Sequence, residues 1–395
     1  MRLHSILTEA TVVLPRNRFE HLLTPAVRAL DRAAREAGYE VRIVGGAVRD
    51  LVMGKNPKDI DMATDAEPET MMKILDAAGI RHEPTGLQHG TITAILDGEP
   101  IEITTLRIDT ETDGRHAEVQ FTNDWRKDAE RRDLTFNAMS MEMNGTLHDY
   151  FDGIQDIQNG VARFVGNADA RMQEDFLRIL RYFRFQGRLN SPTWDRETMD
   201  AVRRNAAGLR KISGERVWME MEKILAQPRS RGDVLERMNE AGVLDAIDMP
   251  TNRINFVNQV DGDDPVAALA AAVNSTTDLD AVRRRWKFST DAYTRARFII
   301  ENRDGDLSDG ALRRMLADPK IRSEHVFSLL NSIGQGNKIA SLKVWTPPVF
   351  PVTGADLTAA GMKPGPLMGQ TLASLRREWE NSGFKLNKEQ LLRKI

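Results

Sequence analysis

Two aspartates, Asp59 and Asp61, are separated by one residue in the segment "KDIDMAT" and could bind a metal ion together. Alternate side chains of a β-strand point to the same face, so a strand here would place both carboxylates side by side. Two anions held this close repel each other, and a divalent cation relieves the repulsion. Such a site can activate a hydroxyl nucleophile and neutralise phosphate charge. A surface turn capped by aspartates has the same spacing, so the pair alone leaves both interpretations open.

A glycine pair, Gly45 and Gly46, follows the apolar run "VRIV" and comes shortly before the two aspartates. Glycine lets the backbone approach a phosphate closely, and Arg49 would add a charge-assisted hydrogen bond. A glycine pair by itself also occurs in ordinary tight turns. The whole pattern G-G-x-V-R-D-x-x-x-G-x(4)-D-x-D is far more specific, and it predicts a nucleotide-phosphate site beside a metal site.

A third group with chemical meaning is the pair Asp175 and Arg178 in "EDFLRILRYFRF". Residues three apart are neighbours on a helix face, so a helix here would bring the two side chains together. A carboxylate only accepts hydrogen bonds and a guanidinium only donates them. Cytosine and adenine both present an amino donor beside a ring acceptor, so the pair would suit C and A and reject U and G. The alternative is an ordinary ion pair between helix neighbours.

The residue types available restrict the metal to an oxygen-bound ion. The chain of 395 residues has no cysteine, and its seven histidines show no metal-ligand spacing. Carboxylate ligands suit a hard cation, so we expect Mg²⁺ as the cofactor. The absence of cysteine also excludes disulfides and thiolate nucleophiles.

The sequence changes character along its length, which predicts how these residues are positioned. Up to about residue 165 we expect helices at 17–38 and 67–79, strands on both sides of Asp97-Gly98, and a polar loop at 109–124. The segment 124–142 is expected to form a helix that leads back towards a strand. From about residue 170 to 340 helical periodicity dominates, including one helix over 171–189.

Five ordered blocks of the sequence resemble a known family, the class II nucleotidyltransferases of the polymerase β superfamily, which includes CCA-adding tRNA nucleotidyltransferases and bacterial poly(A) polymerases. The resemblance covers about residues 40–225. The blocks are the glycine–aspartate stretch 44–64, "RRDLTFNAM" (131–139), "DYFDGIQDIQNGVARFVG" (149–166), "EDFLRILRYFRF" (174–185) and "ISGERVWMEMEKIL" (212–225).

The resemblance implies a multidomain α+β protein. Its head would contain a five-stranded mixed sheet and would be followed by all-α neck, body and tail domains. Mapped onto this chain, the head with its N-terminal helix would span 1–166, the neck 167–230, the body 231–345 and the tail 346–395.

The resemblance also implies roles for single residues. Asp59 and Asp61 would hold Mg²⁺, and a third catalytic acid would be Glu102, Asp128 or Asp133, with Asp133 favoured by its place in the R-R-D block. The nucleotide would be bound by Gly45, Gly46, Arg49, Arg132, Asp175, Arg178, Arg181 and Arg184. A helix turn takes 3.6 residues, so side chains spaced by three residues move gradually around the helix. Arg184 would therefore point away from Asp175 and serve the triphosphate or the tRNA instead of the base.

The predicted function is addition or repair of the 3′-terminal CCA of tRNA from CTP and ATP, without a nucleic-acid template. Its partners would be the tRNA 3′ end and the two nucleotides, with no membrane and no protein partner. The N-terminus lacks the unbroken apolar core of a signal peptide, which predicts a cytoplasmic enzyme. The alternatives are a poly(A) polymerase, an enzyme adding only CC or only A, and a non-catalytic RNA-binding module.

Two further segments leave alternatives open. The run "RRRWKFS" (283–289) would either contact RNA by charge and stacking or end a helix around one buried aromatic residue. The polar segment at about 108–122 would be either a mobile lever that adapts the site from C to A or a passive connection. The net charge of −3 does not indicate nucleic-acid binding, although 11 Lys and Arg outnumber 6 Asp and Glu between Arg171 and Arg216.

Overall fold

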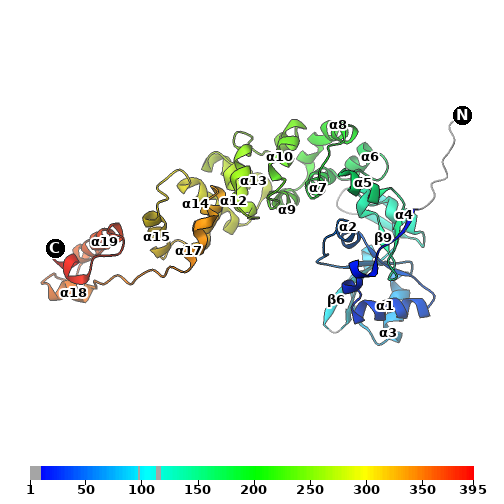
Figure 1. Cartoon of the computed structure of the whole chain (residues 1–395), viewed down its shortest axis with the longest axis horizontal. Coiled ribbons are helices and arrows are strands. Elements are labelled where there is room, and N and C mark those ends of the chain that lie inside the picture. The colour runs from blue at the N-terminus through cyan, green and yellow to red at the C-terminus, as the bar shows by residue number, and fades with distance from the viewer. Residues whose placement is uncertain (1–9, 97, 113–116) are drawn as a thin grey trace. The chain divides into compact units, whose positions relative to one another are not determined.

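The computed structural model describes residues 10–96, 98–112 and 117–395, which Figure 1 draws in colour. The chain divides into two compact units. The first unit comprises Met1–Ile224 and Asp233–Met249, and the second comprises Leu225–Gly232 and Pro250–Ile395. No helix in these described residues is long and apolar enough to cross a membrane. The division into four domains remains a prediction, since head and neck residues fall within one compact unit.

A mixed sheet forms the centre of the first unit. Its order is β1-β10-β9-β2-β3-β6-β5-β4, in which β3 and β6 run parallel and the other neighbours run antiparallel. The expected mixed sheet is therefore confirmed, but its size of five strands was wrong, since eight strands join it. The additional pairing includes short strands that periodicity does not reveal, such as the two-residue strand β9. The strands are β1 (Ala10–Val13), β2 (Val41–Val44), β3 (Asp61–Thr64), β4 (Arg81–Gly86), β5 (Thr91–Leu96), β6 (Glu99–Thr105), β9 (Ser140–Met141) and β10 (Thr146–Asp149).

The central strands β2, β3 and β6 position the acidic residues. All four residues of β2 are buried, including Arg42, whose charge is paired with Glu40. In β3 only the first residue, Asp61, is exposed, while the three that follow are buried. Asp61 is paired with Val44 on one side and with Glu102 on the other. Cross-strand partners point to the same face of a sheet, so Asp61 and Glu102 share a face.

Helices α1 (Pro25–Glu36) and α3 (Pro68–Ala77) contact each other beside this sheet (Figure 1). Both begin with proline at the first helical turn, where its missing N–H costs nothing. The Thr24 hydroxyl accepts a hydrogen bond from the Val27 amide and thereby caps α1. The expected helix at 17–38 therefore starts later, because Thr24 and Pro25 set its first turn.

The expected polar loop at 109–124 was wrong over most of its length. Strands β7 (Arg107–Thr112) and β8 (Ala117–Phe121) pair as an antiparallel hairpin. Residues 113–116 at its tip lie outside the described residues. The polar residues of β7 concealed this pairing, although apolar residues alternate in the sequence of β8. The strands around Asp97-Gly98 are confirmed, since Leu96 pairs with Glu99 across the turn.

Helices complete the first unit. They are α2 (Gly46–Val52), α4 (Trp125–Glu130), α5 (Gly153–Asn159), α6 (Ala168–Glu174), α7 (Leu177–Gln186), α8 (Arg196–Asn205), α9 (Gly214–Leu225), α10 (Arg231–Glu240) and α11 (Val243–Ala246). The segment 124–142 forms α4, a 3-10 turn at Thr135–Asn137 and β9, so its helix is shorter than expected. Beyond residue 166, where every residue is described, all regular elements are helical.

The single helix expected over 171–189 was also wrong, because the chain bends between α6 and α7. Asp175 has an extended backbone, with φ −154° and ψ 106°. Phe176 packs so closely on Gly208 that a Cβ at position 208 would lie 2.1 Å from its ring. This contact holds the corner between the two helices and separates Asp175 from the helix that carries Arg178.

The second unit is built from helices with separate small cores. They include α12 (Pro265–Ala272), α13 (Thr276–Trp286), α14 (Thr290–Asn302), α15 (Asp309–Ala317), α16 (Ser323–Ser332), α17 (Ile339–Lys343), α18 (Gly354–Ala359), α19 (Pro366–Asn381) and α20 (Lys388–Leu392). One buried cluster joins α15, α16 and α17, and another gathers around Trp379 from residues 352–391. A separate tail domain after the prolines at 347–351 remains a prediction, since these residues belong to the same compact unit as the preceding helices.

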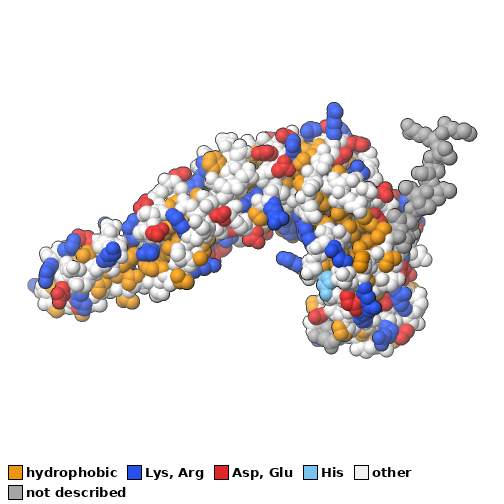
Figure 2. All heavy atoms as spheres, viewed as in Figure 1, with side chains coloured by type: hydrophobic (Ala, Val, Ile, Leu, Met, Phe, Trp, Pro, Cys, Tyr) orange, Lys and Arg blue, Asp and Glu red, His pale blue; other side chains and the backbone are white. Residues whose placement is uncertain are grey.

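Trp286 ends α13 and is fully buried, so it offers no face on which an RNA base could stack. Lys287 closes this helix in the left-handed conformation, with φ +55°. Of the two interpretations of "RRRWKFS", the structure therefore favours the helix end with one buried aromatic residue. On the face shown in Figure 2, basic and acidic side chains are interspersed over both units, in keeping with the small net charge.

Candidate active site

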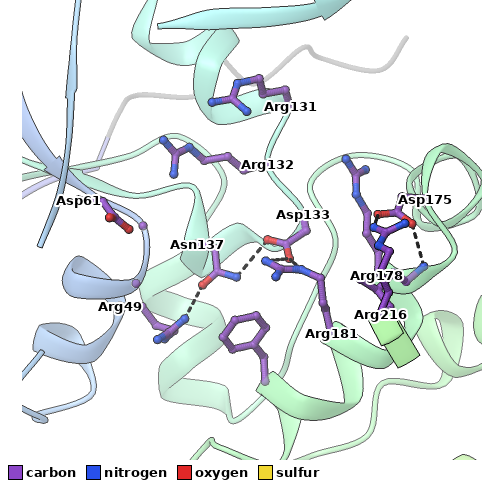
Figure 3. Close-up of a pocket in the computed structure, with 14 residues that line it drawn as sticks. Arg49, Asp61, Arg131, Arg132, Asp133, Asn137, Asp175, Arg178, Arg181 and Arg216 are labelled. Atoms are coloured by element: carbon purple, nitrogen blue, oxygen red, sulfur yellow. Dashed lines mark hydrogen bonds and ion pairs between the residues drawn. The ribbon is translucent and has the colours of Figure 1, made fainter. Parts of the chain in front are cut away.

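A cavity of about 480 Å³ in the first unit brings together residues from four of the five sequence blocks (Figure 3). Asp61 lies at one end of it, and Asp175, Arg178 and Arg216 lie at the other. Six arginines and three aspartates line the cavity, so its walls carry an excess of positive charge suited to a triphosphate. The lining residues are Gly45, Gly46, Arg49, Asp61, Arg131, Arg132, Asp133, Asn137, Asp175, Leu177, Arg178, Arg181, Phe185 and Arg216.

The glycine turn forms one wall of the cavity. Gly45 has φ +66°, a conformation that other residues rarely adopt. A Cβ at this position would lie 3.2 Å from a guanidinium nitrogen of Arg132. Both facts explain why the sequence needs glycine after β2, and the second places Arg132 against the turn.

Asp61 stands at the start of β3 with few partners for its charge. Asp61 keeps an exposed surface, but the protein around it removes part of its water and thereby raises its pKa; Arg132 opposes this rise and the nearby charge of Asp59 adds to it. Asp59 itself is exposed and lies in the bend before β3, so only one of the two carboxylates belongs to the strand. The two still lie near enough to repel each other, which is the feature that a bound cation would relieve.

The middle of the cavity is a connected polar network around Asp133. Arg181 donates to Asp133 from Nε at 2.7 Å and approaches the same carboxylate with a second nitrogen at 2.6 Å. The Asn137 amide donates to Asp133 at 3.0 Å and its oxygen accepts from Arg49 at 2.8 Å. Burial would raise the pKa of Asp133, but these donors outweigh it and hold the pKa below its ordinary value.

Arg49 is more deeply fixed than the sequence suggested. Only 5% of its surface is exposed. It donates to Asp50 with two nitrogens, at 2.9 and 2.7 Å, and its guanidinium lies 4.7 Å from the centre of the Phe185 ring. Arg49 therefore lines the cavity while most of its hydrogen-bonding capacity serves the protein.

At the far end, Asp175 and Arg178 both line the cavity but do not form the ion pair considered from the sequence. Asp175 accepts from Arg216 at 2.6 Å and from the Leu177 amide at 3.0 Å. Arg178 donates to Glu174 and to the Arg171 carbonyl, the latter at 3.2 Å. The simple ion pair between helix neighbours is thus excluded, because each member has a different partner.

Two sequence-predicted residues occupy other places. Arg184 is buried, does not line the cavity, and faces Glu220 of α9 at 3.1 Å. Burial lowers the pKa of Arg184 to about 10. Asp128 is also buried and pairs with Arg131 and Arg132, which makes it a support for the cavity wall.

Several cavity residues were not predicted, although they fall inside the quoted sequence blocks. Asn137 belongs to "RRDLTFNAM", Phe185 to "EDFLRILRYFRF" and Arg216 to "ISGERVWMEMEKIL". Their spacing in the sequence does not indicate that they face one space. Only the folded chain shows this, because it brings the 3-10 turn at Thr135–Asn137, α7 and α9 to the same cavity.

Comparisons with known protein families agree with this geometry. The family described as "Poly A polymerase head domain" matches residues 41–163, and the one described as "Probable RNA and SrmB- binding site of polymerase A" matches residues 193–248. These ranges cover the glycine turn, the acidic strand and part of the helical region of the first unit.

Relatives extend the similarity over nearly the whole chain. The chain is 40% identical over 403 residues to "CCA tRNA nucleotidyltransferase 1, mitochondrial" of Danio rerio, covering 97% of this chain and 93% of the relative. It is also 40% identical over 401 residues to the Homo sapiens protein of the same name, covering 97% and 92%. A "CCA-adding enzyme" of Streptococcus gordonii is 32% identical over 367 residues, covering 86% and 89%.

Solved structures show the same fold. The crystal structure of the Bacillus stearothermophilus CCA-adding enzyme in complex with CTP matches with a TM-score of 0.73 and 26% identity, covering 95% of this chain and 96% of that one. The Thermotoga maritima CCA-adding enzyme complexed with tRNA matches with a TM-score of 0.69 at 21% identity, covering 97% and 98%. The second similarity is one of fold alone.

Proposed function

Because the chain belongs to the family of CCA-adding tRNA nucleotidyltransferases, we propose that it adds C, C and A in turn to the 3′ end of tRNA. The substrates are CTP and ATP, no nucleic-acid template is used, and diphosphate is released. The observation that carries this proposal is one cavity with an acidic strand end at one side and a carboxylate and a guanidinium at the other. The acidic strand end suits transfer of a nucleotidyl group, and the carboxylate with the guanidinium suits selection of a base.

The base-selecting end consists of Asp175 and Arg178. The Asp175 carboxylate accepts the amino group of cytosine or adenine, and Arg178 donates to the ring acceptor beside it. Uracil and guanine present a carbonyl where the amino group is needed, so their oxygen faces the carboxylate and is repelled. Arg132 and Arg181, with the Gly45–Gly46 turn, contact the triphosphate. We leave Arg184 out of this set, since it faces Glu220 away from the cavity.

The acidic end fits a divalent metal ion. The pKa of Asp61 is raised by burial and by Asp59, so this pair lacks sufficient positive charge nearby. Among the described residues no three His, Cys, Asp or Glu are grouped closely enough to hold a metal ion by themselves. Mg²⁺ is commonly bound by one or two carboxylates with phosphates and water as its other ligands. When bound, it would neutralise phosphate charge and promote ionisation of the tRNA 3′-hydroxyl.

The third carboxylate is better assigned to Glu102 than to Asp133. Glu102 is the cross-strand partner of Asp61 and shares its face of the sheet. Both oxygens of Asp133 already accept hydrogen bonds, from Asn137 and the Leu134 amide on one side and from Arg181 on the other. We therefore propose that Asp133 orients Arg181 and Asn137, while Glu102 adds negative charge beside Asp61.

We further propose that the enzyme acts in the cytoplasm, as the sequence predicted. The vertebrate relatives carry "mitochondrial" in their names, so the mitochondrion is the alternative compartment. Cell fractionation followed by immunodetection of the native protein would distinguish the two. Recovery in a protease-protected mitochondrial fraction would contradict the cytoplasmic proposal.

One assay tests the reaction itself. The protein is incubated with Mg²⁺ and a tRNA that lacks its last three nucleotides, with CTP, with ATP and with both, and the tRNA ends are sequenced. We expect ends of CC with CTP alone and of CCA with both nucleotides. Ends that stop at CC with both nucleotides, addition of A only to tRNA ending in CC, or long runs of A would each contradict CCA addition and identify the alternative activity.

A further inference from the structure

The carboxylate of Asp175 is fixed by two donors from the protein. One oxygen accepts from Arg216 of α9 at 2.6 Å, and the other accepts from the backbone amide of Leu177 at 3.0 Å. Both side chains are partly enclosed, with 18% of the Asp175 side chain and 27% of the Arg216 side chain exposed. Arg216 also lines the cavity, so this contact lies in the wall that receives the base.

We propose that Arg216 is a positioning residue that determines base specificity, because it fixes the direction in which Asp175 accepts hydrogen bonds. The inference rests on the proposed role of Asp175 in selecting cytosine and adenine. It adds a residue from a different helix to the base-selecting end and assigns it an effect on selectivity that is larger than its effect on the rate with CTP.

Asp175 needs such support because of where it lies in the chain. It is the extended residue between α6 and α7, so no regular helix restrains its side chain on both sides. The corner itself is held by Phe176, which packs on Gly208. Rotation about the Asp175 side-chain torsions is still open to the carboxylate unless a partner restricts it. The Leu177 amide restricts one oxygen, and Arg216 restricts the other.

The chemistry of the carboxylate explains why its direction matters. A carboxylate has about four acceptor positions on its two oxygens, and the two protein donors occupy two of them. The remaining positions accept the amino group of cytosine or adenine. A carboxylate without Arg216 can turn and accept the ring N–H that uracil and guanine offer. Loss of Arg216 should therefore admit the wrong bases more than it weakens the correct ones.

The other member of the base-selecting pair is held in a similar way. Arg178 donates to Glu174, and Glu174 also accepts from Arg171 at 3.0 and 2.9 Å. The carboxylate of the pair is thus held by a guanidinium, and the guanidinium of the pair by a carboxylate. Each member of the pair is therefore held by a residue of opposite charge. Such contacts fix the directions of the hydrogen bonds that the base must match.

The test compares Arg216→Met and Arg216→Lys with the wild-type enzyme on tRNA lacking CCA with CTP, UTP or GTP, and on tRNA ending in CC with ATP. We expect the ratio of kcat/KM for CTP over UTP to fall by at least about tenfold in Arg216→Met, the change that loss of one charge-assisted hydrogen bond produces. Arg216→Lys should retain part of the selectivity, because one donor and the charge remain. Circular dichroism and thermal unfolding establish that each variant is folded.

Arg210→Met is the matched control. Arg210 also pairs with an aspartate at 2.6 Å, but its partner is the exposed Asp245 and neither residue lines the cavity. We expect its CTP over UTP ratio to equal that of the wild type. If Arg216→Met lost CTP, ATP, UTP and GTP activity in parallel, Arg216 would only join α9 to the cavity wall and the proposal would be overturned.

A double-mutant cycle separates this inference from the function on which it rests. If Asp175→Ala alone leaves the selectivity unchanged, the proposed role of Asp175 fails. If Asp175→Ala relaxes the selectivity and Arg216→Met does not, only the inference about Arg216 fails. We expect Arg216→Met to have no further effect on selectivity in the Asp175→Ala background, because it acts through that carboxylate. A full additional effect there would show that Arg216 contacts the base directly, which would overturn the positioning role.

Discussion

The two ends of the cavity differ in how far the surrounding protein neutralises their charged side chains. At the Asp61 end, burial and the neighbouring Asp59 raise the pKa of the carboxylate, and Arg132 only partly compensates. At the far end, Asp175 is paired with Arg216 and Arg178 with Glu174. One end holds charge that its protein neighbours do not neutralise, and the other holds charges that they neutralise and orient.

The difference indicates what each end must do. Under-compensated carboxylates bind a cation strongly and suit a place where metal and phosphates complete the site. Hydrogen bonds that select a base need fixed directions before the base arrives, and the opposite charges of Arg216 and Glu174 provide them. Preorganisation at the base end and incomplete neutralisation at the acidic end are therefore complementary features of one transferase site.

The largest effect is expected at the acidic end. Asp61→Asn or Asp59→Asn should reduce CMP addition by at least about 1,000-fold, the upper end of what loss of one electrostatic contact in an active site costs. Binding of tRNA, measured by gel shift, should stay nearly unchanged. Asp76→Asn, which changes an exposed aspartate on α3, is the matched control. Activity within a few-fold of wild type in either site variant would contradict the two-carboxylate site.

A change in the β7–β8 hairpin tests whether the base-selecting end accepts a purine without movement of another element. A rigid pair that takes C twice and then A needs another element to move, and the hairpin follows directly after β6. Replacing residues 110–118 with a short Gly-Ser linker should leave CMP addition largely intact and reduce addition of the final A by about 100-fold. Sequencing of tRNA ends measures both steps. Full CCA at normal rates would show a passive hairpin, and loss of CMP addition as well would place the hairpin in the common site.

A smaller effect is expected on stability at the centre of the cavity. The network of Arg181, Asn137 and the Leu134 amide holds the pKa of Asp133 low in spite of burial, so this carboxylate stabilises the fold at neutral pH. This contribution is present above the ordinary aspartate pKa and is lost as the pH falls through the lowered one. Asp133→Asn should lower the free energy of unfolding by about 2 kcal/mol, since a third of Arg181 remains in contact with solvent.

Urea denaturation at pH 7 of wild type and Asp133→Asn measures this difference. Asp169→Asn offers a comparison, because Asp169 also pairs with an arginine at 2.6 Å but at a more exposed place. We expect its effect to be below about 1 kcal/mol, as for other surface pairs. Equal effects of the two substitutions would show that the network around Asp133 has no special stability.

Sequence patterns predicted the glycine turn and the strand at Asp61, where local geometry decides the structure, but they also placed Asp59 in that strand, whereas it lies in the bend before it. The glycine turn needs a left-handed residue at Gly45, and the strand end at Asp61 follows from a buried run after one exposed residue. The chain corner at Asp175 could not be predicted, because it depends on Phe176 packing against Gly208, a contact over 32 positions. Arg216 was missed for the same reason: its partner lies 41 positions away, and periodicity carries no information about such pairs.

The smallest predicted effect is on the stability of Asp61→Asn. It sharpens the comparison of the two cavity ends most, because it separates the stability of the fold from the activity of the enzyme. A carboxylate whose folded pKa is raised stabilises the fold only in its protonated form, and this contribution is lost as the pH rises through the raised pKa. At neutral pH the ionised Asp61 therefore works against folding, by less than about 1 kcal/mol because it keeps contact with solvent.

The inactive Asp61→Asn variant should thus unfold at a slightly higher temperature than wild type, and the gap should narrow below about pH 4, where both side chains are neutral. Added Mg²⁺ should stabilise wild type but not the variant, which reverses their order. An Asp61→Asn variant that is less stable than wild type at pH 7 would show that the acidic end is as well compensated as the base end.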